Sequence, residues 1–436
     1  MELAVSIMKG YMLFTIALMC VFTLRHFIFT VNRLYGKQRI YCQDIMDSEL
    51  KTVSVLIPMH NEEKVCRGIL DRMLLVDYDF DKFEVIPIND HSEDKTKAVL
   101  DEYAQKHPKL FKPLHRYEGQ RGKSSALNDA LELATGEIAI VFDADYLPPR
   151  NIIKNIAVSF NDPEVGAVMG RVVPVNTRVN MLTQLLDLER SGGYQVDQQA
   201  RYNLGLVPQY GGTVGGFLRQ AVIDSGSFDV NVLAEDTELT FRLVLNGYKV
   251  AYANRAECYE EVPESWTMRA RQIRRWARGH NDVMFRYFFT VLRSNHLVGW
   301  TKLDIFLLAL VYVLPVILLV CMFVSVTLFF LGDMEIFAGI FFLVFIGVYN
   351  TFGNFAPFYQ VGTACLLDGM RQRILLLPHL IFSFYFYMWY ISRGFFDAVL
   401  DRVLRRRAKW EKTARFRSED IEKDLGVSIG GGKQVT

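Results

Sequence analysis

The chain has 436 residues and a nearly balanced charge, with 49 Lys and Arg side chains against 48 Asp and Glu. This balance excludes a protein that binds nucleic acid through bulk positive charge, because such a surface needs a basic excess. Hydrophobic residues make up 51% of the chain, and long apolar runs lie in residues 3–31 and 305–400. Length and composition therefore predict one or two globular domains joined to a membrane part, and they exclude a disordered protein.

The first apolar run predicts a membrane anchor in residues 1–34. Gly10–Leu24 is uncharged and lies between Lys9 and Arg25. A cleaved signal peptide is the alternative, but the segment has no convincing small-x-small cleavage site. We therefore expect the segment to be retained.

Residues 45–262 read as a soluble domain in which strands alternate with helices. Strands are expected at Val53–Ile57, Phe83–Ile88 and Ile138–Phe142, and helices at Glu62–Leu75, Glu93–Gln105 and Lys123–Ala134. This alternation is typical of a mainly parallel sheet covered on both faces. Ligands bind such sheets outside the carboxyl ends of the strands.

Polar side chains follow each of the three strands, in Pro58–Glu62, Asn89–Asp94 and Asp143–Asp145. Because the strand ends are expected to meet at one sheet edge, we predict that a nucleotide and a metal ion bind there. Asp143 and Asp145 stand two residues apart on a turn, where they can hold a hard divalent cation that binds a diphosphate. Alone, such a pair is a weak signal, because Asp-rich turns are common.

Two other nucleotide sites are excluded by residue type. Gly122-Lys123-Ser124 matches the end of a phosphate-binding loop, but that pattern requires Gly at position 117, where the chain has Tyr117. No G-x-G-x-x-G motif follows a predicted strand, which excludes a dinucleotide site of that type.

Two later segments allow both a structural and a chemical interpretation. Glu235-Asp236 opens a predicted helix, Asp236–Leu245, where acidic residues also complement the helix dipole. Gln272-Ile273-Arg274-Arg275-Trp276 lies in residues 263–300, a basic amphipathic stretch that predicts interfacial helices on anionic lipid. The interfacial interpretation does not exclude a catalytic role for Gln272, Arg275 and Trp276.

Residues 301–400 predict a C-terminal membrane region. Ile305–Gly332 is uncharged and long enough for a full span. Ile336–Leu367 is interrupted by Gly, Asn and Pro, which predicts one span followed by an interfacial or broken segment. Ile374–Ser392 offers a further span, with Tyr and Trp residues that suit the membrane interface.

Basic residues near the span ends predict the orientation. Arg33, Lys37 and Arg39 follow the first apolar run, and the tail, residues 401–436, opens with a cluster of arginines. The positive-inside rule then places the soluble domain and the tail in the cytoplasm. We expect a multi-pass protein of the plasma or inner membrane. The number of C-terminal spans stays open, since three spans would place the basic tail outside and four would place Arg371 and Arg373 outside. We favour a cytoplasmic tail, because the tail carries more positive charge.

Taken together in chain order, these motifs resemble those of processive, membrane-embedded family 2 glycosyltransferases, such as cellulose, hyaluronan and poly-N-acetylglucosamine synthases. The resemblance covers roughly residues 50–290 and rests on Asn89–Asp94, Asp143-x-Asp145, Glu235-Asp236 and Gln272-x-x-Arg275-Trp276, together with Ile57–Glu62 and Gly122–Asn128. Ala234 departs from the family pattern, because many relatives have Thr before Glu-Asp. The resemblance implies an α/β fold: a Rossmann-like nucleotide-sugar transferase domain of the GT-A type, with a mainly parallel sheet, inserted between N- and C-terminal transmembrane helices.

The resemblance also implies roles for single side chains. Asp145 would be the main ligand of Mg²⁺ or Mn²⁺, with Asp143 assisting on the nucleotide-sugar side, and Asp236 would be the general base, with Glu235 the less expected candidate. Further contacts with the donor would come from Pro58, Asn61, Glu62, Asp90 and Lys123. Gln272 and Arg275 would contact the diphosphate. Gly212, Thr213 and Trp276 would contact the acceptor. The indole of Trp276 would be a flat floor for the acceptor, because sugar rings present apolar C–H faces.

The expected reaction is an inverting, metal-dependent transfer, because one base without a carboxylate nucleophile implies a single displacement. The sugar would pass from a nucleoside-diphosphate donor, with UDP the expected nucleotide, to a growing β-linked polysaccharide. Export would be coupled to synthesis, since the polymer hydroxyls would lose their partners in hydrocarbon. Accessory export or regulatory subunits would be further partners.

Other functions stay open at the level of sequence. A non-processive enzyme would add a single sugar to a membrane lipid, and ceramide glucosyltransferases resemble this pattern too. A receptor or scaffold with a degenerate transferase domain is disfavoured, because such a protein has no need of the base Asp236. A transporter is also disfavoured, since the spans are few and no inverted repeat is visible.

Overall fold

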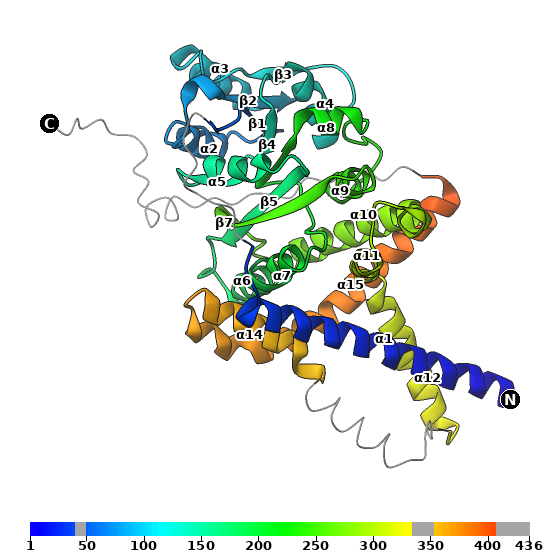
Figure 1. The fold of residues 1–436 in the computed structure, drawn as a ribbon. Coiled ribbons are helices and arrows are strands. Elements are labelled where there is room, and N and C mark those ends of the chain that lie inside the picture. The colour runs from blue at the N-terminus through cyan, green and yellow to red at the C-terminus, as the bar shows by residue number, and fades with distance from the viewer. Residues whose placement is uncertain (40–48, 334–352, 407–436) are drawn as a thin grey trace.

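The computed structural model describes residues 1–39, 49–333 and 353–406. Figure 1 shows a sheet domain that rests on a layer of helices, with the long N-terminal helix α1 (Glu2–Tyr35) running along the far side of that layer. The chain thus separates into a part built around a sheet and a part built from apolar helices.

The described strands form one seven-stranded sheet in the order β3-β2-β1-β4-β6-β5-β7. The strands are β1 (Val53–Met59), β2 (Phe83–Asp90), β3 (Leu114–Arg116), β4 (Ile138–Val141), β5 (Val165–Pro174), β6 (Gly215–Leu218) and β7 (Lys249–Glu260). Strands β3, β2, β1 and β4 run parallel, β6 is antiparallel to both of its neighbours, and β5 and β7 are parallel to each other. The predicted mainly parallel sheet is confirmed, with one antiparallel strand inside it.

Helices cover both faces of the sheet, which is why its strands are almost continuously buried. These helices are α2 (Cys66–Met73), α3 (Thr96–Lys106), α4 (Lys123–Leu133), α5 (Ile152–Ala157), α8 (Arg219–Asp224) and α9 (Glu235–Leu245). Helices α2 and α3 begin later than the expected Glu62 and Glu93. The preceding residues instead form loops that hydrogen-bond to each other.

The register of the parallel strands brings their carboxyl ends to one edge. Met59 of β1 pairs with Asn89 of β2, and Leu56 of β1 pairs with Val141 of β4. Asp90, the last residue of β2, and Asp143, two residues beyond the end of β4, therefore lie at the same edge of the sheet.

A polar helical run lies between the sheet and the apolar helices. It consists of α6 (Met181–Ser191), the π-helical segment η4 (Gly192–Gln198) and α7 (Gln199–Asn203). It contacts β5 on one side and α1 and α14 (Ala356–Leu367) on the other. π-Helical segments are rare and occur frequently at functional sites.

The apolar helices differ from the expected spans in one respect. The expected span Ile305–Gly332 is broken into α11 (Gly299–Leu310) and α12 (Leu314–Phe330), which meet at 64°. A proline lies in the first turn of α12, where its missing N–H does no harm but prevents a continuous helix.

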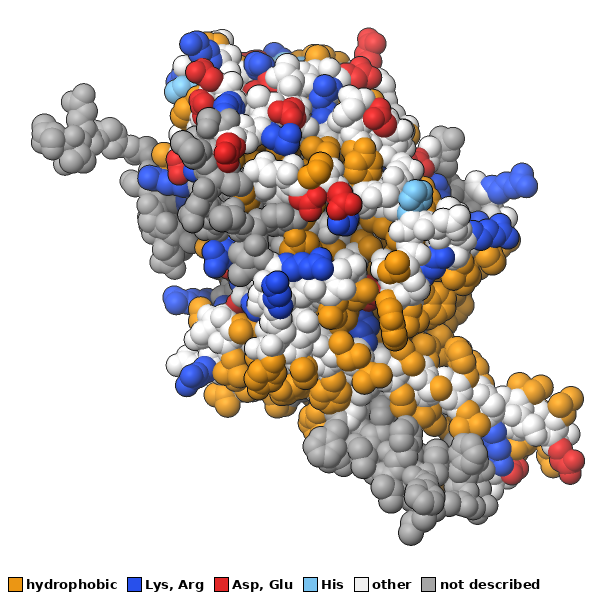
Figure 2. Space-filling view, viewed as in Figure 1, with side chains coloured by type: hydrophobic (Ala, Val, Ile, Leu, Met, Phe, Trp, Pro, Cys, Tyr) orange, Lys and Arg blue, Asp and Glu red, His pale blue; other side chains and the backbone are white. Residues whose placement is uncertain are grey.

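Two described helices are long and apolar enough to cross a membrane, Glu2–Tyr35 and Arg371–Leu404, and the bent pair would be a third. The segment Arg371–Leu404 combines η6 (Arg371–His379) with α15 (Leu380–Leu404). Most of the expected segment Ile336–Leu367 lies outside the described residues, and its end forms α14. In Figure 2 the apolar side chains gather over the helical layer, and charged side chains dominate the sheet domain.

Four charged side chains, three of them buried and Asp197 half-buried, join the N-terminal helix, the polar run and the bent pair. Arg25 of α1 pairs with Asp197 of η4 at 2.8 Å, Arg201 of α7 pairs with the same Asp197 at 2.7 Å, and both arginines pair with Asp304 of α11. We call these residues the charge quartet. Removing one member of such a buried set typically costs about 3–5 kcal/mol, because it leaves a charge without its partner.

Candidate active site

The loops that follow β1 and β2 hold each other in place. Nδ1 of His60 donates to the backbone oxygen of Asp90 at 2.7 Å. The N–H of Glu93 donates to Oδ1 of Asn61 at 2.8 Å, and the N–H of Glu62 donates to Oγ1 of Thr96 at 2.9 Å. Pro58, Asn61 and Glu62 thus lie at the expected sheet edge, and the last two shape the loops there. Their expected contacts with a donor stay predictions.

Asp90 is buried at the end of β2 and is held from two sides. Arg116 of β3 forms an ion pair with one carboxylate oxygen, and the N–H of Gly122 donates to the other at 2.8 Å. Arg116 also binds Oγ of Ser125 at 2.8 Å and Asp129 at 2.6 Å. Arg116 therefore fixes Asp90 relative to the start of α4. No motif in the sequence marks Arg116, because β3 is only three residues long.

Lys123, the first residue of α4, connects two further turns. Its Nζ donates to Oδ1 of Asp143 at 2.7 Å and to the backbone oxygen of Gly212 at 2.8 Å. Burial acts to lower the pKa of Lys123, but the carboxylates of Asp143, Glu235 and Asp236 outweigh burial and raise it. The ammonium group thus stays charged and balances the acidic side chains around it.

The turn at Gly212 and Thr213 lies between the Asp143 turn and Asp236. Oγ1 of Thr213 accepts a hydrogen bond from the N–H of Asp143 at 3.1 Å. Gly212 has a φ of +75°, and a Cβ atom there would lie 3.2 Å from Oδ2 of Asp236. This position therefore needs glycine both for its backbone conformation and for its closeness to the carboxylate. Asp143 and Asp236 are 93 residues apart in sequence (236 − 143 = 93), yet they border the same turn.

Glu235 and Asp236 are half-buried at the N-terminus of α9. Oδ1 of Asp236 accepts a hydrogen bond from the N–H of Thr237 at 2.6 Å. Burial and the negative charge of Asp236 raise the pKa of Glu235 to about 7, and burial raises the pKa of Asp236 as well. Two adjacent carboxylates with raised pKa values can accept a proton near neutral pH.

Close glycine contacts position α10 (Trp266–Arg293), the helix that carries Gln272, Arg275 and Trp276. A Cβ atom on Gly279 of α10 would lie 2.9 Å from Cβ of Ala234, directly before Glu235. A Cβ atom on Gly394 of α15 would lie 2.5 Å from the backbone oxygen of Arg274. Helix α10 is therefore packed closely between the start of α9 and α15. The small side chain of Ala234, a departure from the family pattern, suits this contact.

Helix α10, which carries the Gln-x-x-Arg-Trp motif, contacts α9. The positive charge of Arg275 acts to lower the pKa of Glu235. Oε1 of Gln272 accepts a hydrogen bond from Arg269 at 2.8 Å. The guanidinium carbons of Arg190 and Arg269 lie 5.5 Å and 5.2 Å from the ring centroid of Trp276.

The two guanidinium groups that contact the indole of Trp276 are themselves held in ion pairs. Arg190 is paired with Glu260 at 2.7 Å, and Arg269 with Glu189 at 2.5 Å. The hydroxyl of Tyr387, on α15, also donates to Glu189 at 2.6 Å. The ring is thus oriented by a network that joins α6, β7, α10 and α15, and its stacking on an acceptor sugar stays a prediction.

Asp143 and Asp145 fit a divalent cation only in combination with a substrate. Among the described residues, no cluster of three or more His, Cys, Asp or Glu side chains gathers in a way that could hold a metal ion. Mg²⁺ commonly binds through one or two carboxylates together with substrate phosphates and water. Because Lys123 already binds Asp143, Asp145 is the better candidate for the main ligand.

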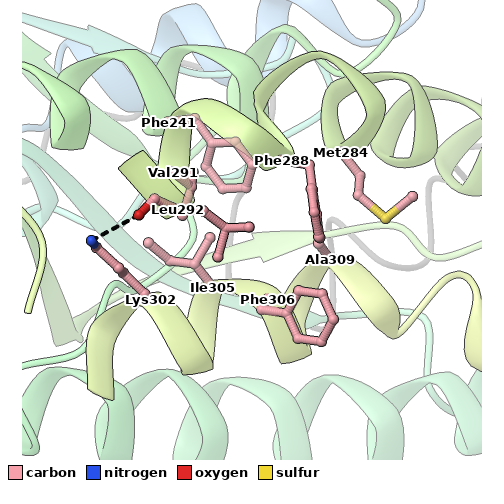
Figure 3. Close-up of a pocket in the computed structure, with 9 residues that line it drawn as sticks. All are labelled: Phe241, Met284, Phe288, Val291, Leu292, Lys302, Ile305, Phe306 and Ala309. Carbon is pink, nitrogen blue, oxygen red and sulfur yellow. Dashed lines mark hydrogen bonds between the residues drawn. The ribbon is translucent and has the colours of Figure 1, made fainter. Parts of the chain in front are cut away.

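A small apolar pocket lies apart from these carboxylates, between α9, α10 and α11 (Figure 3). Phe241, Phe288 and Phe306 contribute much of its lining, and Nζ of Lys302 donates to the backbone oxygen of Leu292 at 2.9 Å. The lining has no catalytic side chain, and Lys302 is engaged at the end of α10. This pocket therefore belongs to helix packing and not to the candidate site.

Comparisons with known proteins agree with this geometry. Residues 51–279 match the family described as "Glycosyltransferase like family 2". The probable glycosyltransferase YdaM of Bacillus subtilis (strain 168) is 30% identical over 378 residues, which cover 84% of this chain and 88% of that protein. The poly-beta-1,6-N-acetyl-D-glucosamine synthase of Staphylococcus aureus (strain COL) is 28% identical over 256 residues, 58% of this chain and 60% of that enzyme.

A solved structure supports the fold. The mannosyltransferase PcManGT from Pyrobaculum calidifontis, in complex with GDP-Man and Mn²⁺, matches with a TM-score of 0.58 at 20% identity. The match covers 86% of this chain and 98% of that chain. At this identity the likeness shows the fold, which is the expected GT-A type.

Proposed function

Because the chain belongs to glycosyltransferase family 2, we propose that it transfers a sugar from a nucleoside-diphosphate donor, expected to be a UDP-sugar, to a growing β-linked polysaccharide. Transfer proceeds with inversion at the anomeric carbon and is coupled to export of the product. The observation that carries this proposal is the single turn at Gly212, which borders Lys123, Asp143 and Asp236. This arrangement supplies a donor-side carboxylate, a cation and a base at one sheet edge.

Each side chain has a task in the proposed reaction. Asp90, fixed by Arg116 and Gly122, accepts hydrogen bonds from the nucleoside. Lys123 and Arg275 balance the negative charge of the departing diphosphate. Asp236 removes the proton from the acceptor hydroxyl as that oxygen attacks the anomeric carbon, and a raised pKa suits a base that works near neutral pH.

The proposed cofactor is Mg²⁺ or Mn²⁺, held by Asp145 with help from Asp143. When bound, the ion would act as a Lewis acid that stabilises the diphosphate leaving group. Asp145 is buried at the end of the β4 turn, beside the residues that would contact the donor.

We further propose that the protein is embedded in the plasma or inner membrane with its sheet domain in the cytoplasm. The apolar helices and the concentration of apolar side chains in Figure 2 support this placement. The poly-beta-1,6-N-acetyl-D-glucosamine synthase relative makes UDP-N-acetylglucosamine the first donor to test.

A membrane-lipid acceptor is the second candidate. The two candidate spans bury only 28% and 17% of their most apolar windows inside the described protein. Helices that face lipid to this extent give a lipid acceptor a direct route to the site, with transfer of a single sugar.

The test is a panel of nucleotide sugars offered to the full-length protein in lipid vesicles with Mg²⁺ or Mn²⁺. We expect release of nucleoside diphosphate with one donor, together with a ladder of β-linked oligomers. A single glycolipid product would replace the first candidate by the second, and a product with retained α configuration would contradict the single displacement. No turnover with any donor would contradict the transferase proposal.

The acid limb of the rate profile is expected to lie above the usual pKa range of an aspartate. The base, Asp236, must be ionised, and burial raises its pKa. The ionised fraction of Asp236 therefore falls at a higher pH than that of an exposed aspartate, and kcat/KM should fall about tenfold per pH unit below the limb. Glu235→Gln removes one negative charge beside Asp236, so the limb should move to lower pH. An unchanged limb in this variant would contradict the coupling.

A further inference from the structure

His280 lies on α10 just over one turn beyond Trp276, outside every motif discussed above. Its ring stacks on that of Tyr312, with centroids 4.5 Å apart and planes inclined by 9°. Tyr312 occupies the break between α11 and α12. Nδ1 of His280 lies 3.0 Å from Oγ1 of Thr237, the residue that follows Asp236. His280 therefore contacts both the bent apolar pair and the first turn of α9.

The hydroxyl of Thr237 is contacted by both Gln209 and His280. Nε2 of Gln209 donates to Oγ1 of Thr237 at 2.7 Å. Gln209 is itself fixed by Gln198 of η4, since its N–H donates to Oε1 of Gln198 at 3.0 Å and its backbone oxygen accepts from Nε2 of Gln198 at 3.2 Å. Because Oγ1 accepts from Gln209, its own proton can be donated to Nδ1 of His280. Nδ1 accepts that proton in the neutral imidazole tautomer that carries its proton on Nε2.

The same threonine orients the carboxylate of Asp236. Its backbone N–H donates to Oδ1 of Asp236 at 2.6 Å, while Gly212 borders the other oxygen. A side chain that holds Thr237 on one side thus limits the directions in which Asp236 can point. A small misalignment of a reacting group can lower the rate by about a hundredfold, so such support affects turnover.

We propose that His280 is a positioning residue for the transfer reaction: it holds Thr237, and through it the carboxylate of Asp236, in line with the acceptor hydroxyl. The stack on Tyr312 fixes the imidazole and joins this alignment to the bent apolar pair. The proposal rests on the proposed function, since it assigns His280 to the base of that reaction. His280 touches neither substrate nor reacting atoms in this role.

Two substitutions at position 280 separate hydrogen bonding from packing. His280→Phe keeps a ring that can stack on Tyr312 but removes the acceptor for Thr237. His280→Asn removes the stack but places an amide oxygen near the position of Nδ1. Thr237→Val removes the hydroxyl and keeps the backbone N–H that binds Asp236. The full-length protein in lipid vesicles is used throughout, with the donor that the panel identifies.

We expect His280→Phe to lower kcat by about tenfold with donor KM and the unfolding temperature close to those of the original protein. His280→Asn should recover kcat to within about threefold of the original, because the acceptor is restored. Thr237→Val should cause a loss at least as large as that of His280→Phe, because it also removes the acceptor of Gln209. The double variant should lose no more than Thr237→Val alone, since the hydroxyl that His280 contacts is already absent.

Three results would overturn the assignment. His280→Phe with full kcat would show that the hydrogen bond has no effect on turnover. Losses that multiply in the double variant would show that His280 and Thr237 act independently. An activity of His280→Asn as low as that of His280→Phe would show that only the imidazole ring, and not its acceptor, is needed. These three results apply when the unsubstituted protein turns over the donor. If the unsubstituted protein turns over no donor, the proposed function is contradicted instead.

Discussion

Asp236→Asn is expected to lower the turnover of sugar transfer by about a thousandfold, within the range usual for loss of a general base. The amide has the shape of the carboxylate, and its oxygen can still accept the hydrogen bond from the N–H of Thr237. It cannot take a proton from the acceptor hydroxyl. We therefore expect the variant to bind the donor with unchanged affinity but to form almost no product. Donor affinity and diphosphate release are the two measurements.

The matched control for this variant is Glu235→Gln, which removes the neighbouring carboxylate on the same helix turn. If Asp236 is the base, Glu235→Gln should retain most of the activity above the acid limb. A large loss in Glu235→Gln together with full activity in Asp236→Asn would assign the base to Glu235. Loss of donor binding in Asp236→Asn would show that the residue serves the donor and not the acceptor.

Asp145→Asn is expected to lower activity by at least about a hundredfold at moderate Mn²⁺ or Mg²⁺, because a divalent cation contributes several kcal/mol to leaving-group stabilisation and roughly 3 kcal/mol corresponds to a factor of a hundred. The substitution removes one negative charge from a buried turn and keeps its shape. The measurement is activity as a function of metal concentration, which should shift to higher concentrations in the variant.

Asp143→Asn is the comparison for this experiment, because Asp143 is already bound to Lys123. We expect a smaller shift in metal dependence and a larger effect on the KM for the donor. Donor affinity measured with and without metal separates the two carboxylates. If Asp143→Asn shifts the metal curve more than Asp145→Asn, the two assignments are reversed. If chelation of metal leaves the original protein fully active, the cation has no part in the reaction.

The sequence predicted the sheet domain well, because strands that are buried on both faces appear as continuous apolar runs. The expected Val53–Ile57, Phe83–Ile88 and Ile138–Phe142 correspond to β1 (Val53–Met59), β2 (Phe83–Asp90) and β4 (Ile138–Val141). Each of these strands is an apolar run that ends in polar residues, so both the strand and its end can be recognised in the sequence. The closeness of Asp90 and Asp143 followed from the rule for ligand sites in such sheets, whereas Asp236 was placed at the same site only by the family resemblance.

The rest depended on contacts that have no local pattern. The polar run α6-η4-α7 carries charged residues whose partners lie on distant helices. The break in Ile305–Gly332 follows from a proline whose effect on an apolar run is ambiguous in sequence, because helices in lipid also tolerate proline. Arg116 and His280 could not be singled out in the sequence, because only the fold brings them to their partners. Arg116 pairs with Asp90, and His280 contacts Thr237.

The charge quartet also bears on how the protein is made. During translation α1 is made before α11, and Asp304, one of the partners of Arg25, is synthesised 279 residues after it. Until α11 is made, Arg25 and Arg201 share only Asp197. A ribosome stalled before residue 304 would therefore leave the two arginines with one carboxylate between them.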